Sequence, residues 1–97
     1  MKTFKNISQI LEKEKPLLAK QYHVRNVGIF GSYLHQTQKK NSDLDILVEF
    51  STIPGFFKFL ELENYLSSLL QIKVDLVMKD ALKPSIGKQI LQEVHYV

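Results

Sequence analysis

Phe30-Gly31-Ser32, ten further residues, and then Asp43-Leu44-Asp45-Ile46-Leu47-Val48-Glu49-Phe50 form the stretch that decides the fold. Apolar residues lead up to Gly31 and follow Asp43, which predicts two strands, over residues 24–30 and 44–50. Between them we expect a short helical turn and a polar connection. This connection is too short for a long crossover helix, so the two strands are predicted to run antiparallel.

Outside this stretch, helical and strand patterns alternate along the chain. Apolar residues at helical spacing predict three helices, over residues 6–22, 56–70 and 81–93. A third strand is predicted over residues 73–78, where apolar side chains flank a single acidic one. We therefore expect an α/β fold in which a small mixed β-sheet of about three strands is covered by helices.

The first helix carries two local signals. Asn6 is predicted to cap its start, with Gln9 three residues later in a capping-box arrangement. Pro16 predicts either a kink in one helix or the first turn of a second helix.

Three carboxylates are the candidate metal ligands. Alternate side chains of a strand share a face, so Asp43 and Asp45 are predicted to project together. Asp75 joins them if the third strand lies beside the second. Paired carboxylates suit Mg²⁺, which takes oxygen ligands and shares phosphate oxygens, and a cation relieves their mutual repulsion. Alone, Asp43-Leu44-Asp45 is more typical of a solvated turn, and Asp75 fits a surface position equally well. The three together favour a metal site.

Gly31 and Ser32 are the candidate phosphate-binding residues. They follow a predicted strand and open a predicted helical turn, where backbone N–H groups attract phosphate. Gly31 allows close approach of the backbone, and the Ser32 hydroxyl can donate to a phosphate oxygen. A Gly-Ser pair alone is more often a plain turn with a serine cap. The interpretation depends on the carboxylates that follow.

Composition limits the classes of function. The 97 residues favour one domain over residues 1–97, and the absence of cysteine excludes disulfides, thiolate zinc sites and cysteine nucleophiles. A cytoplasmic location is compatible with this, and no apolar run reaches the ~20 residues that span a membrane. The net charge of +3 fits an anionic substrate such as a nucleotide. Lysines are dispersed and Arg25 is the only arginine, which disfavours direct nucleic-acid binding.

The Gly-Ser-x10-Asp-x-Asp pattern, with the later Val74-Asp75-Leu76-Val77 strand, resembles the minimal nucleotidyltransferases of the polymerase-β-like superfamily. Within them the chain is most similar to the MntA-type antitoxins that pair with HEPN-domain toxins. The resemblance covers nearly the whole chain and implies the nucleotidyltransferase fold. It implies that Asp43 and Asp45 are catalytic and bind metal, and that Asp75 is the third metal-binding carboxylate. Gly31 and Ser32 would hold the triphosphate.

The resemblance also implies an activity. Such proteins transfer AMP from ATP, with Mg²⁺, to a tyrosine of the partner HEPN toxin, which implies a hetero-oligomer with that toxin. One departure stands out, because many members continue after Gly-Ser with a small residue, arginine and glycine. Here His35 and Gln36 replace the arginine and the glycine. Two alternatives stay open: nucleotidyl transfer to a small molecule, and a non-catalytic antitoxin that neutralises its partner by binding.

Overall fold

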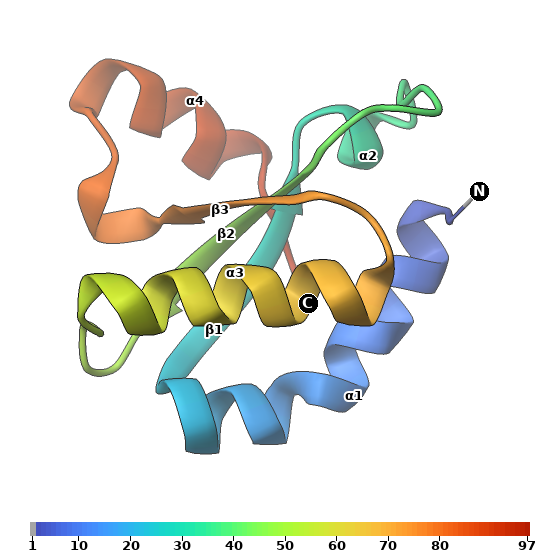
Figure 1. The fold of residues 1–97 in the computed structure, drawn as a ribbon. Helices are drawn as coiled ribbons and strands as arrows, with labels where there is room; N and C mark the ends of the chain where they lie inside the picture. Colours follow the sequence, from blue (N-terminus) through green and yellow to red (C-terminus); the bar gives the residue numbers. More distant parts are fainter. Residues whose placement is uncertain (1) are drawn as a thin grey trace.

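The computed structural model describes residues 2–97 and has helices on both sides of one sheet (Figure 1). The helices are α1 (Phe4–Tyr22), α2 (Ser32–His35), α3 (Phe56–Leu70) and α4 (Pro84–Glu93), with a 3-10 turn η1 (Lys79–Ala81) before α4. The strands are β1 (Val24–Phe30), β2 (Leu44–Phe50), β3 (Val74–Met78) and β4 (His95–Tyr96). Figure 1 shows α1 and α3 against one face of the sheet and α4 on the opposite side.

The sheet is mixed, with strand order β3-β2-β1-β4. β1 and β2 are antiparallel, which confirms the prediction from their short connection. β2 and β3 are parallel, because α3 carries the chain back along the sheet between them. β2 therefore lies between β1 and β3, and side chains from all three strands meet on each face.

The sheet has four strands rather than the three expected. The fourth, β4, pairs antiparallel with Gly28 and Ile29 of β1. Its two residues are too few to show a strand periodicity, and the backbone hydrogen bonds that define it reach a segment more than sixty residues earlier in the chain. The predicted last helix also begins later than expected, because η1 and an extended step precede Pro84.

Alternation along β2 separates the core from the opposite face. Leu44, Ile46 and Val48 are fully buried in the cluster that also contains the inward side chains of α1 and α3. Asp45 and Glu49 point to the other face and remain partly exposed. This face, which we call the carboxylate face, also receives the side chain of Asp75 from β3, since Val74 and Leu76 are buried on the core side.

The structure of α1 shows that one prediction about this helix was wrong and settles between the two alternatives at Pro16. Thr3, not Asn6, is the N-cap, and Asn6 occupies the third helical position of a capping box. Pro16 lies inside one helix, which bends along its length in Figure 1. At the other end His23 is left-handed, and its carbonyl accepts a hydrogen bond from the Ser51 amide. Across residues 2–97, no helix has the length and apolar character needed to cross a membrane.

Candidate active site

Gly31 joins β1 to α2 and lies directly against Asp45. Its φ of +78° and ψ of −150° fall where residues with a side chain are strained. A Cβ built at this position would also overlap the Oδ2 oxygen of Asp45. Both the backbone conformation and the space therefore require glycine here. The strand register brings the two residues together, because Phe30 pairs with Asp45.

Ser32 is the first residue of the short helix α2. The first amides of a helix have no partner within it, so they are free to donate to a ligand. The last turn closes tightly, since Gln36 is left-handed and its amide donates to the Ser32 carbonyl. The Thr37 amide donates to the same carbonyl at 2.9 Å. Because Gly31 lies against Asp45, this helix starts next to the Asp45 carboxylate of β2.

Asp45 and Asp75 are direct partners on neighbouring strands, so their side chains project side by side from the carboxylate face. Asp43 lies two residues before Asp45, immediately ahead of β2. Partial burial, then the negative charge of Asp75 and then that of Asp43 together raise the pKa of Asp45 from 3.8 to about 6. Asp75 and Asp43 therefore lie close enough to Asp45 for their charges to act on it.

These carboxylates fit a hard divalent cation by their chemistry. Their oxygens are the ligands that Mg²⁺ prefers, and a cation would offset the repulsion felt at Asp45. Within residues 2–97, however, no three acidic or histidine side chains are already gathered closely enough to hold an ion. Asp43 lies 4.0 Å from the Lys73 ammonium. Their assignment as metal ligands therefore stays a prediction.

A cleft of about 920 Å³ opens beside Asp43, between the start of α1 and the segments that precede β2 and β3. Lys2, Lys40 and Lys73 line it, together with polar and apolar side chains of the same segments. Lys40 belongs to the Lys39-Lys40 pair, for which the sequence favours a solvated turn and offers triphosphate binding as the second interpretation. Lys2 and Lys73 have no local signal, because only the fold brings them to this cleft.

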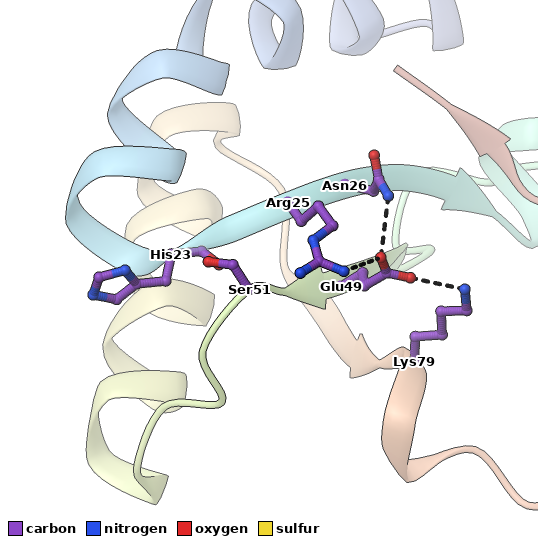
Figure 2. Close-up of polar contacts among 6 residues, drawn as sticks. All are labelled: His23, Arg25, Asn26, Glu49, Ser51 and Lys79. Carbon is purple, nitrogen blue, oxygen red and sulfur yellow. Dashed lines mark hydrogen bonds and ion pairs between the residues drawn. The ribbon is translucent and has the colours of Figure 1, made fainter.

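The far end of the carboxylate face is held by Glu49 (Figure 2). Its carboxylate accepts from the Lys79 ammonium at 2.7 Å and from the Asn26 amide at 3.3 Å, and it lies 3.5 Å from the Arg25 guanidinium. The hydrogen bond from Lys79, more than any other contact, lowers the pKa of Glu49. This cluster ties β1, β2 and η1 together and was not predicted from the sequence.

His35 and Glu93 make a further link that sequence reasoning missed. The His35 Nε2 atom lies 3.3 Å from the Glu93 carboxylate, so the end of α2 contacts the end of α4. The contact joins segments 58 residues apart, and no local pattern signals it.

Residues 5–97 match the protein family described as polymerase beta, nucleotidyltransferase. A protein adenylyltransferase MntA from Thermococcus cleftensis is 50% identical over 97 residues, covering all of this chain and 98% of that protein. A Methanocaldococcus jannaschii protein whose name proposes the same activity is 52% identical over 98 residues, covering both chains in full. The chain belongs to the polymerase-β nucleotidyltransferase family.

Solved structures agree with this assignment. One described as a minimal nucleotidyltransferase superposes with a TM-score of 0.83 and 28% identity, covering 97% of this chain and 95% of that one. A toxin–antitoxin crystal structure with AMP-PNP superposes with a TM-score of 0.71 and 27% identity, covering 96% of this chain and 70% of that one. The nucleotidyltransferase fold expected from the sequence is confirmed.

Proposed function

We propose that this chain transfers AMP from ATP to a tyrosine of a partner HEPN-domain toxin and thereby acts as an antitoxin. The observation that carries the proposal is the contact of Gly31 with Asp45, beside Asp75 on the adjacent strand. It combines a phosphate-binding helix start and paired carboxylates in one place. The adenylyltransferase name of a half-identical relative and the toxin–antitoxin structure with AMP-PNP support it.

In this proposal Gly31 and Ser32 bind the triphosphate. Glycine leaves the backbone open to close approach, and the Ser32 hydroxyl donates to a phosphate oxygen. Asp43, Asp45 and Asp75 would hold Mg²⁺. When bound, Mg²⁺ supplies positive charge that offsets the charge developing on the phosphates.

The reaction is an in-line displacement at the α-phosphorus. The tyrosine oxygen forms a bond to the α-phosphorus, the bond from that phosphorus to the α–β bridging oxygen breaks, and pyrophosphate leaves. The tyrosine proton passes to Asp75 and then to water. Positioning and electrostatics supply most of the catalysis, as in other phosphoryl transfers.

Mass spectrometry of the HEPN protein after incubation with Mg-ATP and this chain tests the proposal. We expect a mass increase of one AMP on a tyrosine, and loss of that increase with Asp43→Asn and Asp45→Asn together or with EDTA. An unmodified HEPN protein, with the complex formed and both Mg²⁺ and Mn²⁺ tried, would argue against transfer.

A non-catalytic antitoxin is the second candidate, and two observations favour it. Asp43 lies near Lys73, and His35 stands where the family resemblance implies an arginine. If the protein works by binding alone, the Asp43→Asn, Asp45→Asn variant still silences the toxin. Loss of silencing by a variant that still binds the HEPN protein excludes this candidate.

A further inference from the structure

The strand β3 lies at one edge of the sheet, with β2 as its neighbour. Successive residues of a strand direct their backbone groups to opposite sides. The Leu44 amide of β2 donates to the Lys73 carbonyl at 2.9 Å, so Lys73 and Asp75 face β2. Val74 and Leu76 therefore turn their amides to the outer edge, where there is no strand to accept them and each needs another acceptor.

Two side chains of α3 accept these outward amides. The Val74 amide donates to the Ser67 Oγ atom at 3.0 Å. The Leu76 amide donates to a carboxylate oxygen of Glu63 at 2.9 Å. Glu63 and Ser67 are four residues apart, so they lie on the same side of α3, which runs alongside β3 (Figure 1). We call Glu63 and Ser67 the edge pair.

The edge pair is itself held in place. The Ser67 hydroxyl donates its proton to the Glu63 carbonyl at 2.9 Å, which leaves the Ser67 oxygen free to accept from β3. The helix that carries both residues is firmly packed, because Leu62 and Leu66 are buried in the core and the Tyr65 hydroxyl donates to a carboxylate of α1. The edge pair therefore fixes the outer side of β3 to a helix that cannot easily shift.

The two amides bonded in this way flank Asp75. This residue pairs with Asp45 on β2, and its side chain is exposed. Because packing does little to fix an exposed side chain, the place of the Asp75 carboxylate depends on the backbone of β3. That backbone is bonded to β2 on one side and to the edge pair on the other. A metal ligand has to be held within about 0.5 Å of its productive position, and bonding on both sides serves this need.

We infer that Glu63 and Ser67 are positioning residues, which act through the backbone of β3 to set the Asp75 carboxylate beside Asp45. This inference rests on the proposed function, in which Asp75 binds metal and accepts the tyrosine proton. The Glu63 carboxylate is suited to the task, because a hydrogen bond from an amide to a charged oxygen is stronger than one to a neutral oxygen.

Disruptive and conservative substitutions separate this role from packing of the helix. Glu63→Met with Ser67→Ala, the disruptive variant, removes both acceptors. Glu63→Gln with Ser67→Thr, the conservative variant, keeps an oxygen at each position. Glu61 and Ser68 lie on the same helix but are exposed, and Glu61 forms an ion pair with Lys58 at 3.3 Å. Glu61→Met with Ser68→Ala is therefore the matched control.

The experiment measures Mn²⁺ affinity by electron paramagnetic resonance with AMP-PNP present, and amide hydrogen exchange by NMR. We expect the disruptive variant to bind Mn²⁺ about tenfold more weakly, as loss of the groups that support metal ligands does. The conservative variant and the control should bind Mn²⁺ as the wild type does. Exchange of the Val74 and Leu76 amides should become faster in the disruptive variant alone. Ser67→Ala by itself should give a smaller loss in the same direction, and it replaces the disruptive variant if that protein does not fold.

The same substitutions in an Asp75→Asn background separate positioning from general destabilisation. If the edge pair acts through Asp75, its removal should lower Mn²⁺ affinity no further once residue 75 is asparagine, although amide exchange still becomes faster. An equal further loss in both backgrounds overturns the inference, as does a wild-type affinity that does not depend on Asp75. Self-association of the disruptive variant with unchanged Mn²⁺ affinity overturns it too, because the edge pair then only protects the open edge of the sheet.

AMP transfer to the HEPN protein is measured separately, so that the two proposals can fail independently. Mn²⁺ binding that depends on Asp75 and on the edge pair, without AMP transfer by the wild type, keeps the positioning role and rejects the transferase proposal. AMP transfer by the wild type, with Mn²⁺ binding that is unchanged in the disruptive variant, keeps the transferase proposal and rejects the positioning role.

Discussion

The Asp45 carboxylate occupies the space that a side chain at Gly31 would need. Gly31 directly follows β1 and Asp45 lies in β2, and the pairing of Phe30 with Asp45 brings the two residues together. The candidate phosphate-binding turn and the candidate metal site are therefore one packed unit. A change at either residue is expected to disturb the other.

Gly31→Ala should destabilise the protein and abolish nucleotide binding together. The new side chain is strained at φ +78° and displaces Asp45, so we expect a loss of about 1–3 kcal/mol in the free energy of unfolding. Urea denaturation and AMP-PNP titration measure the two effects. Gly55→Ala is the control, because nothing lies within 4 Å of a Cβ there and its φ is −69°. Equal behaviour of the two variants would contradict the steric relationship.

Asp45→Asn should stabilise the metal-free protein at neutral pH while abolishing AMP transfer. The pKa of Asp45 rises from 3.8 to about 6 on folding, so the folded state binds the proton more tightly. The stabilising effect of the protonated Asp45 carboxyl on the folded state is present in full below pH 4 and is lost as the pH rises through 6. After allowance for the partial exposure of Asp45, the asparagine variant should gain about 1 kcal/mol at pH 8.

Urea denaturation at pH 4, 6 and 8 measures this difference. The wild type should lose stability relative to Asp45→Asn between pH 4 and 6, and Mg²⁺ should restore the wild type at pH 8 without helping the variant. A constant difference in the free energy of unfolding between the two proteins from pH 4 to 8 would show that folding does not destabilise the charged form of Asp45.

Local pattern was sufficient for the main elements but not for the relations between them. The apolar runs predicted β2 over residues 44–50 and α3 over residues 56–70, which the structure confirms. Both elements bury one regular set of side chains, and such periodicity is visible in sequence. Thr3 was missed as the cap of α1, because Thr3 and Asn6 both favour helix starts and only the hydrogen bonds distinguish their positions.

The site shows the same division. Residue types and spacing singled out Gly31, Asp45 and Asp75 before any geometry was known. Their mutual contact depends on the register of three strands, which pairs residues thirty positions apart. The ion pairs of Lys73 with Asp43 and of Lys79 in η1 with Glu49 likewise form only in the folded chain, and no local sequence pattern predicts them.

Glu49→Gln should lower the melting temperature. The Glu49 carboxylate accepts hydrogen bonds from Lys79 and Asn26 and forms an ion pair with Arg25. A neutral amide at this position cannot form ion pairs with the two cations. Lys79→Met should also destabilise, and the double variant should lose less than the sum, since the two residues share one contact. Glu12→Gln, which removes an exposed carboxylate 3.9 Å from Lys15 on α1, should leave the melting temperature unchanged. Strict additivity would refute the coupling between Glu49 and Lys79.

His35→Arg should improve the use of ATP. Arginine is always charged and can form a lasting ion pair with the Glu93 carboxylate, which lies 3.3 Å from the His35 Nε2 atom. A lasting contact with Glu93 holds the end of α2, whose first residue is Ser32, and so fixes the phosphate-binding turn. Both partners are half exposed, so the gain should be less than about fivefold.

The KM for ATP is the measurement that separates this role from general stability. We expect KM to be lower for His35→Arg than for the wild type. Glu93→Gln should raise KM and remove most of the benefit of arginine at position 35. If His35→Arg, Glu93→Gln retains the full benefit, the gain comes from arginine meeting the nucleotide itself and not from its contact with α4.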